Sequence, residues 1–350
     1  MRQYIALCFF LYLLPFPTWA QELFGSDSIL QIKISGDLRS LMTDDGDNPS
    51  QHPIDIQYQD DKGSTLRLSI AARTRGNFRR TMGGCTYPPI MLLFHDSVKL
   101  AGTLFHQQKK LKLVMPCKGD QYVAKEYLAY RVYQLLTPMA FRARLVKLTL
   151  EDTRKNKTSE PFLAMLLEEE HQLATRNSMV SVEKKIGPRQ AEVSAFHRMA
   201  VFEYFIGNTD WSVEYLQNVK LLAKDSNGIA YTVPYDFDHA GIVSPPYAKP
   251  AEQLQLSSVR ERRYRGYCLT DLNLLKPFIT EFLQARDKIN SLYETASYLD
   301  ASNKKTAVKF IDDFYRIIGD EEKWKKEFAY PCDKNGTGNV IISGMQKSNN

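Results

Sequence analysis

The chain has 350 residues, which is long enough for one large two-lobed domain or for two ordinary domains. Its hydrophobic fraction of 43% and charged fraction of 25% are those of a globular protein, which excludes a largely disordered chain. The 46 basic and 40 acidic side chains give a formal net charge of +6. This mild excess is compatible with binding phosphate groups, but it does not indicate a partner that is a nucleic acid.

The first 20 residues have the pattern of a secretory signal peptide. Arg2 precedes an apolar run from Tyr4 to Pro17, and small residues at Thr18 and Ala20 precede a cleavage point before Gln21. The run is shorter than the roughly 20 residues needed to span a bilayer. The sequence therefore predicts an extracytoplasmic protein, periplasmic or secreted. We expect no membrane span after the signal is removed, and a net charge of about +5 once Arg2 is lost (6 − 1).

The cysteines fit an oxidising compartment. Removing the signal also removes Cys8 and leaves four cysteines, an even number that predicts disulfide bonds. Four cysteines allow three pairings, and we favour Cys85–Cys117 and Cys268–Cys332 because each pair lies within one of two predicted lobes. A zinc site is disfavoured because the chain has no CxxC or CxxH spacing.

The segment after the signal alternates apolar and polar residues in the manner of β-strands. Strands are predicted at residues 27–36, 54–58, 65–74, 88–94 and 108–115. Residues 41–53 are rich in turn formers and are expected to form an exposed loop. The first hundred or so mature residues are thus predicted to form a mostly antiparallel β unit.

Two basic features of this β unit are candidate phosphate-binding groups. Arg75-Gly76-Asn77 follows a predicted strand, where a glycine among arginines lets backbone and guanidinium groups approach phosphate closely. Lys110 and Lys112 alternate with Leu111 and Leu113, so we expect the lysines on one face and the leucines on the other. Lys112 and Arg75 are our candidates for binding a nucleotide. An ordinary basic turn and a solvated strand face are the alternative interpretations.

A helix is predicted from Tyr122 to Leu136, ended by Thr137-Pro138. Glu126 lies one turn inside this helix and is the candidate partner of Lys112 in a nucleotide-binding ion pair. Further strands are predicted at 142–150 and 162–167. The acidic run Glu168-Glu169-Glu170 after them is expected to be the solvated start of a helix.

The stretch from Phe196 to Gly241 carries the candidate catalytic residues. Apolar residues at helical spacing predict a helix that stops at Gly207, and a hairpin with strands at 218–222 and 229–233 follows. Polar side chains stand at the ends of the hairpin strands: Asp210 and Asn218 before the first strand, and Asp236 and Asp238 after the second.

These side chains suit phosphoryl transfer. That reaction needs a carboxylate to orient the acceptor hydroxyl, and hard oxygen ligands for a divalent ion. We assign Asp210 as the catalytic base, Asn218 and Asp236 as ligands of Mg²⁺ (or Mn²⁺), and Asp238 as an assisting metal ligand. The alternative is that these Asp and Asn residues are turn formers whose side chains bond to nearby backbone.

The same residues carry a family resemblance. The helix, the Asn-Thr-Asp loop at 208–210, the Asn-Val-Lys-Leu-Leu strand at 218–222 and the Asp-Phe-Asp turn at 236–238 resemble the catalytic segment of atypical protein-kinase-like proteins. The likeness is to the spore-coat protein H (CotH) kinase-like family and to the HipA-like kinases. Arg75-Gly76-Asn77 also resembles the N-terminal signature of the CotH-like family. Ordinary kinases place the metal-binding Asn five residues after the catalytic Asp. Here the spacing is 218 − 210 = 8, so we expect a three-residue insertion.

The resemblance implies an α+β, two-lobed protein-kinase-like fold. The antiparallel β-rich N-terminal lobe, with one long helix, would cover residues 21–167. The mostly helical C-terminal lobe would cover 168–334, and a flexible tail would cover 335–350. Residues 244–250 would form an extended loop at the place where kinases keep their activation segment. The charged cluster at 258–266 would either bind an anionic acceptor or pair with the acids of the site.

The function implied by the resemblance is Mg²⁺-dependent transfer of phosphate from a nucleoside triphosphate, ATP, to a hydroxyl of a protein or small molecule. A catalytically inactive kinase-fold binding or scaffold protein is the first alternative. The missing glycine-rich loop and the long Asp-to-Asn spacing favour it, and so does the scarcity of ATP expected outside the cytoplasm. A metal-dependent hydrolase that uses the Asp cluster is the second alternative. No GxGxxG, GxSxG, HExxH or P-loop motif occurs, so the common dinucleotide, hydrolase and zinc-protease functions lack their motifs.

Overall fold

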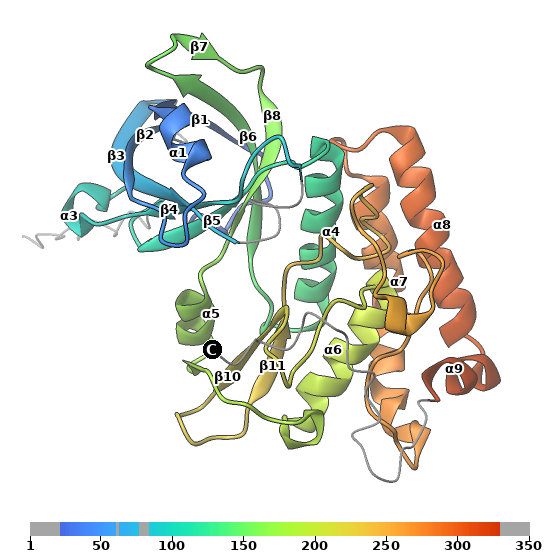
Figure 1. Cartoon of the computed structure of the whole chain (residues 1–350). Coiled ribbons are helices and arrows are strands. Elements are labelled where there is room, and N and C mark those ends of the chain that lie inside the picture. The colour runs from blue at the N-terminus through green and yellow to red at the C-terminus, as the bar shows by residue number, and fades with distance from the viewer. Residues whose placement is uncertain (1–21, 61–62, 77–83, 330–350) are drawn as a thin grey trace, which may run out of the picture.

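The computed structural model describes residues 22–60, 63–76 and 84–329. The predicted signal peptide at 1–20 and the predicted tail at 335–350 lie outside these residues. The fold is α+β, with a β-rich N-terminal region beside a helical C-terminal region (Figure 1). Within the described ranges, every helix is too short or too polar to cross a membrane.

Seven strands of the N-terminal region form a closed barrel. They are β1 (Leu30–Gly36), β2 (His52–Gln59), β3 (Thr65–Thr74), β4 (Ile90–Leu93), β5 (Lys110–Val114), β8 (Phe162–Leu167) and β6 (Ala143–Asp152), in that order around the barrel. Neighbouring strands are antiparallel except where β6 meets β1 in parallel and closes the barrel, with Ile32 opposite Leu148. The short strand β7 (Lys157–Thr158) extends the sheet beyond β6. The predicted antiparallel strands are confirmed, but the parallel closure was not predicted.

The interior of the barrel is a hydrophobic core built from alternate residues of each strand. On β5, Leu111 and Leu113 are buried in this core, while Lys110 and Lys112 lie on the outer face. The predicted division of this strand into two faces is therefore confirmed. Two short helices, α1 (Leu38–Thr43) and α3 (Ser97–Leu100), lie in the connections. Since α1 extends to Thr43, the predicted loop at 41–53 begins later than expected.

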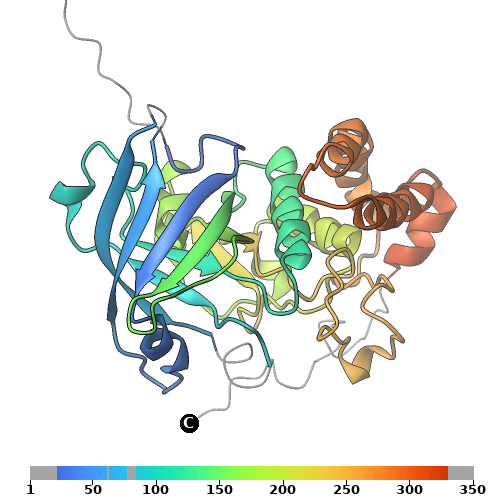
Figure 2. The same cartoon turned by 90° about the horizontal axis from the view of Figure 1, so that it is seen from above.

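Helix α4 (Asp120–Leu136) stands between the barrel and the C-terminal helices (Figures 1 and 2). Its buried tyrosines, including Tyr130 and Tyr133, belong to a second hydrophobic core. That core joins the outer face of β8, through Met165 and Leu167, to the helical region. We assigned this helix to the N-terminal lobe, but its packing ties the two regions together.

The C-terminal region contains five helices within the described ranges and one small sheet. The helices are α5 (Glu170–Arg176), α6 (Val193–Ile206), α7 (Lys276–Glu294), α8 (Ala301–Ile318) and α9 (Glu321–Phe328). Short 3₁₀ turns occur at η1 (Pro188–Gln190), η2 (Glu252–Leu254) and η3 (Leu272–Leu275). The strands are β9 (Val180–Val182), β10 (Val219–Ala223) and β11 (Tyr231–Pro234), with β10 between the other two.

The predicted helix stop and hairpin are both present. Gly207 is the C-cap of α6 in the left-handed conformation, with φ of 68°. A Cβ at this position would lie 2.9 Å from the ring of Phe310, so only glycine fits without a shift. Strands β10 and β11 pair in antiparallel fashion with Val219 opposite Pro234, which confirms the hairpin and brings its polar ends to one side.

The predicted disulfide Cys85–Cys117 is confirmed. It joins the segment before β4 to the segment before α4, where Thr86 also donates its N–H to the carbonyl of Cys117 over 3.1 Å. Cys268 is disulfide-bonded as well. Its predicted partner Cys332 lies outside the described residues.

Replacing both Cys85 and Cys117 by serine should lower the free energy of unfolding. The bond spans 32 residues of chain, and freeing a loop of that length is expected to cost about 3 to 4 kcal/mol through the entropy of the unfolded state. Equilibrium urea unfolding without reductant measures the change and leaves the bond of Cys268 intact. A double variant within about 1 kcal/mol of the wild type would contradict the expectation.

Candidate catalytic site

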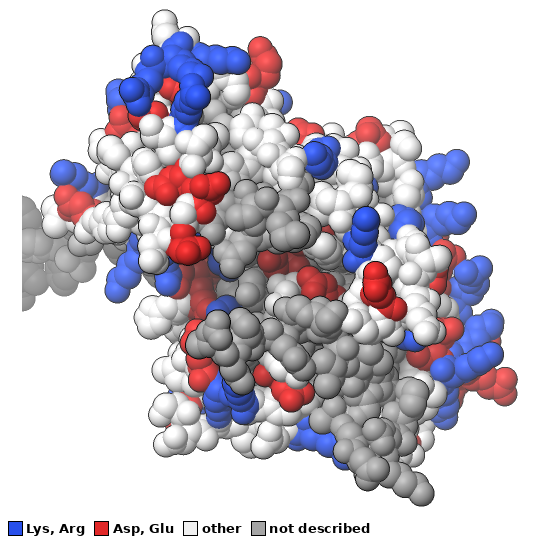
Figure 3. Space-filling view, in the orientation of Figure 1, with Lys and Arg blue, Asp and Glu red and all other residues white. Residues whose placement is uncertain are grey.

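The candidate site lies where the barrel meets the helical region. Strand β5 and helix α4 contribute from one side, and the loops around the β10–β11 hairpin contribute from the other. Figure 3 shows acidic side chains along this junction, while many of the lysines and arginines in this view lie at the outer ends of the molecule. The chain as a whole is basic, so the acidic side chains at the junction are a local feature of this region.

The loop that carries Asp210 is shaped by the end of α6. Asn208 donates its N–H to the carbonyl of Glu203 over 2.8 Å, and its side-chain oxygen accepts the N–H of Asp210 over 3.0 Å. The Glu203 side chain is fully buried, and this burial raises the pKa of its carboxyl well above its usual value. Glu203 was not predicted as a site residue because it is hidden within an apolar helical run.

A buried arginine supports the same loop. Arg265 donates to the carbonyls of Thr209 over 2.5 Å and Trp211 over 2.8 Å. Arg262 donates to the carbonyls of Phe205 and Phe310. These two members of the charged cluster at 258–266 thus position the backbone around Asp210, a role that neither of our two interpretations of the cluster included.

The chain returns to Asp210 through a closed loop. Ser212 and Gln217 exchange two backbone hydrogen bonds of 2.9 Å each, which closes the chain between them. Asn218 then donates its side-chain amide to the backbone carbonyl of Asp210 over 2.7 Å and to its carboxylate over 3.1 Å. The loop therefore accommodates the long Asp-to-Asn spacing and brings the two predicted residues into contact.

The turn after β11 is held by helix α4. The N–H of Asp236 donates to the hydroxyl of Tyr130 over 2.8 Å, and the rings of Tyr130 and Phe237 pack with centroids 4.6 Å apart. Burial raises the pKa of the Tyr130 hydroxyl, which keeps it protonated. Asp236 and Asn218 both have left-handed backbones, with φ of 64° and 51°. Such conformations are sparsely populated outside glycine and often occur at functional sites.

The predicted base lies close to the other predicted acids. Burial raises the pKa of the Asp210 carboxyl, and the negative charges of Asp238 and Asp236 raise it further. His239 and Arg265 act in the opposite direction. Asp210, Asp236 and Asp238 thus lie within electrostatic range of one another, on the same side of the molecule.

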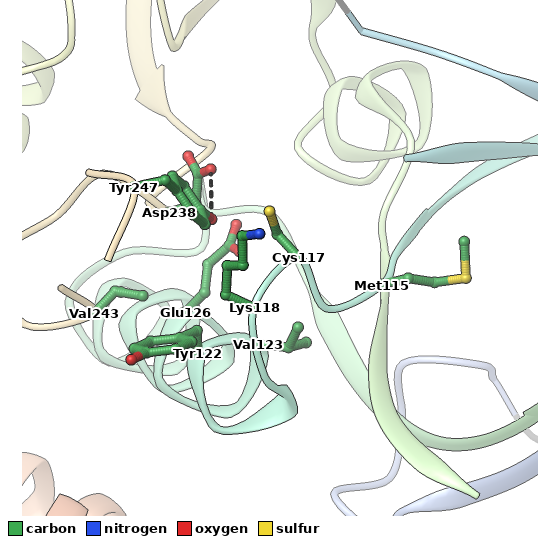
Figure 4. Close-up of a pocket in the computed structure, with 9 residues that line it drawn as sticks. All are labelled: Met115, Cys117, Lys118, Tyr122, Val123, Glu126, Asp238, Val243 and Tyr247. Atoms are coloured by element: carbon green, nitrogen blue, oxygen red, sulfur yellow. Dashed lines mark hydrogen bonds between the residues drawn. The ribbon is translucent and has the colours of Figure 1, made fainter. Parts of the chain in front are cut away.

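Asp238 and Glu126 face a small pocket beneath the turn (Figure 4). Both side chains are buried, with exposures of 7% and 2%. The hydroxyl of Tyr247 donates to Asp238 over 3.1 Å, and Lys118 lines the pocket beside Glu126. Glu126 therefore shares its surroundings with Asp238 and Lys118.

Lys112 has different neighbours. Its ammonium lies 4.5 Å from the centroid of the Tyr235 ring, in a cation–π contact. Burial lowers the pKa of Lys112 to about 7, with a further decrease from Arg75 and an opposing effect of Asp236. Across the described ranges, the ion pairs do not include Lys112 with Glu126, so the predicted pair is not formed. Lys112 instead lies within electrostatic range of Asp236.

A second lysine, Lys220, lies near Lys112, and its partner belongs to the acidic run at 168–170. Lys220 of β10 forms an ion pair with Glu170 over 2.8 Å and lies 5.9 Å from the centroid of the Tyr235 ring. Glu168 is buried and paired with Arg176 over 2.8 Å, so the expectation of a solvated acidic run is wrong at this residue. Lys220 was not predicted as a site residue. The alternation of a short strand shows which face a side chain occupies, but it does not show which residues of other elements lie opposite that face.

The predicted metal ligands carry oxygen donors of the type that hard divalent cations prefer. No group of three or more His, Cys, Asp and Glu side chains in the described ranges is arranged to hold a metal. The predicted ligands instead combine an amide, Asn218, with the carboxylates of Asp236 and Asp238. Asn218 uses its amide nitrogen on Asp210, which leaves the amide oxygen for another contact. Donors of this type suit Mg²⁺, which keeps several waters and substrate phosphates as its other ligands.

A larger pocket opens beside Asp210. Its volume is about 160 Å³. It is lined by Thr209, Asp210, His239, Lys249, Ala251 and Val259. Thr209 and Val259 are buried, whereas Lys249 is exposed. The pocket therefore runs from the surface to the predicted catalytic base.

No protein-family model matches this chain, and a search of curated proteins finds no relative. The function must therefore be inferred from the geometry of the site.

Replacing Arg265 by methionine should destabilise the protein, because two carbonyls of the Asp210 loop lose a buried charged donor. We expect the free energy of unfolding to fall by about 2 to 4 kcal/mol. Arg263→Met is the matched control, since this arginine is exposed two positions away. Urea unfolding measures both variants, and hydrogen exchange at residues 208–211 tests whether the loss begins in this loop. Equal stability of the two variants would contradict the role of Arg265.

Proposed function

We propose that this chain is a kinase-like phosphotransferase with a two-lobed protein-kinase-like fold, which transfers the γ-phosphoryl group of ATP to a hydroxyl. The observation that supports this most strongly is the convergence of Asp210, Asp236 and Asp238 at the junction, with Lys112 in electrostatic range of Asp236. Transfer of a phosphoryl group depends chiefly on positioning and charge neutralisation, and this set of side chains provides both.

In the proposed reaction, Asp210 orients the acceptor hydroxyl and accepts its proton. The acceptor oxygen forms a bond to the γ-phosphorus, the bond from that phosphorus to the β–γ bridging oxygen breaks, and ADP leaves with the electron pair. Burial and the neighbouring acids raise the pKa of Asp210. A carboxylate with a raised pKa is a more effective base near neutral pH than an ordinary one.

The charges of the nucleotide would be met on the other side of the site. Lys112, Lys220 and Arg75 supply positive charge around Tyr235. Asn218, Asp236 and Asp238 would hold Mg²⁺ (or Mn²⁺), which neutralises phosphate oxygens when bound. Asn218 directly precedes β10, Asp236 follows β11, and both residues have left-handed backbones.

A specific observation also favours the alternative of an inactive binding or scaffold protein. In protein kinases the ion pair between the strand lysine and the helix glutamate must be in place for activity. Here Lys112 contacts Tyr235 and does not pair with Glu126.

We further propose that the chain works outside the cytoplasm, a location that the bond between Cys85 and Cys117 supports.

Calorimetry with Mg²⁺ and ATP tests the proposal directly. We expect the wild type to bind, and Asp236→Asn to lose at least about tenfold in affinity because a charged metal ligand becomes neutral. Asparagine tolerates the left-handed backbone of this position, so the turn should be kept. Asp225→Asn, at an exposed turn of the hairpin, is the matched control and should bind as the wild type does. Asp210→Asn should bind ATP and transfer no phosphate. Absence of ATP binding in the wild type would overturn the enzyme and support the scaffold.

Nucleotide binding should take up a proton above neutral pH. The pKa of Lys112 is lowered to about 7 in the free protein, so much of it is neutral at pH 8. Phosphate beside it favours the charged form and raises this pKa again. ATP affinity should therefore fall as the pH rises from about 7 to 9, and should be nearly constant just below that window, where Lys112 is already charged.

The proton is counted by repeating the calorimetry at pH 8 in buffers of different ionisation enthalpy. Lys112→Arg should abolish the part of the uptake that belongs to Lys112, because guanidinium stays charged throughout. Lys305→Arg, at an exposed position of α8, is the matched control and should retain the uptake. The same proton count in Lys112→Arg and the wild type would contradict the assignment.

A further inference from the structure

The pocket beside Asp210 is too small to be the nucleotide site. Its volume is about 160 Å³, whereas pockets for drug-sized ligands measure roughly 300 Å³ or more. A cavity of this size holds about as much as one benzene molecule. It therefore suits a single side chain, with the rest of its ligand lying outside.

The pocket has a polarity along its depth. Buried Thr209 marks the inner end, and half-buried Asp210 lies beside it in the lining. Asp236 and Asp238 lie outside the lining but within electrostatic range of Asp210, and His239 of the lining offsets part of their effect. An anion entering this end would be repelled, whereas a neutral hydroxyl can donate a hydrogen bond to the carboxylate. The inner end therefore suits a hydroxyl group.

The outer end has the opposite character. Lys249 is exposed at the rim and forms no ion pair with any residue in the described ranges. The acid nearest to it in sequence, Glu252, begins the short turn η2 and does not line the pocket. The other outer residues include Ala251, which carries no charge. An anion next to the hydroxyl would therefore find a lysine without a competing partner.

We propose that this pocket binds a serine or threonine side chain of a polypeptide, with its hydroxyl on Asp210 and a neighbouring glutamate or aspartate of the same polypeptide on Lys249. The inference rests on the proposed function, because it assigns the acceptor of that reaction. Lys249 would then determine which hydroxyls are accepted, and Asp210 would act on them.

Direct binding of peptides tests this without nucleotide. Three fluorescent peptides carry one serine flanked by glutamate, by glutamine or by lysine, and anisotropy gives their affinities for the full chain. We expect the glutamate peptide to bind roughly two- to fivefold more tightly than the glutamine peptide, the size of one solvent-exposed ion pair. Lys249→Glu should remove this preference and favour the lysine peptide. Lys305→Glu, which makes the same charge change on exposed α8, should keep the preference.

Three results would overturn the inference. The first two are equal affinity for the glutamate and glutamine peptides, and an acidic preference that survives in Lys249→Glu. The third is that glycerate, a small molecule with hydroxyl and carboxylate groups but no polypeptide, binds as tightly as the glutamate peptide. Transfer assays with ATP and the same peptides add a second measurement, in which the glutamate peptide should have the lowest KM. Failure of Mg²⁺–ATP binding would refute the proposed reaction, whereas the peptide affinities report on the pocket alone. The two failures are therefore distinguishable.

Discussion

The hydrogen bond from the N–H of Asp236 to the hydroxyl of Tyr130 joins the two halves of the candidate site. Tyr130 belongs to α4, which is buried between the outer face of β8 and the C-terminal helices, so its hydroxyl has little freedom. Asp236 has a left-handed backbone, a conformation that residues other than glycine populate sparsely. The hydrogen bond, together with the packing of Phe237 on the Tyr130 ring, helps to stabilise it here. The Asp236 carboxylate is thereby directed by its backbone and remains available for other contacts.

The charges of the site are arranged around this fixed turn. Burial raises the pKa of Asp210, and the two neighbouring carboxylates of Asp238 and Asp236 raise it further. Holding like charges together is unfavourable unless a cation offsets them. Arg265 offsets part of the charge while it holds the loop carbonyls, and His239 contributes in the same direction. On the other side of the turn, Lys112 lies near Arg75 and Lys220, where the excess is positive. The junction therefore separates an acidic half from a basic half, an arrangement that suits a cation and a phosphate chain side by side.

Much of the local structure could be predicted because its causes are local. Alternation gives the bounds of β3, a short apolar run gives those of β8, and Gly207 ends α6 because only glycine fits there. The non-local features had no such signal. The parallel pairing of β1 with β6 closes the barrel between strands more than a hundred residues apart. Arg265 and Tyr130 act through backbone groups of distant loops, so nothing in their own neighbourhood marks them. The structure brings the predicted acids together, but it does not form the predicted pair of Lys112 with Glu126. Periodicity predicts which face of a strand or helix a side chain occupies, and it does not predict which residue of another element that side chain will contact.

The separation of Lys112 from Glu126 follows from what holds each residue. Glu126 shares a buried pocket with Lys118, and Lys118 is adjacent to Cys117, whose disulfide ties this segment to the chain before β4. Lys112 is held over Tyr235, the residue directly before Asp236. The acids that act on Lys112 are Asp236 and Glu170, both on the C-terminal side of the junction. The fixed turn at Asp236 can thus orient the lysine that faces it without the helix glutamate. Tyr130 and Tyr235 thus hold Asp236 and Lys112 at one short turn, within the larger core that joins the barrel to the helical region.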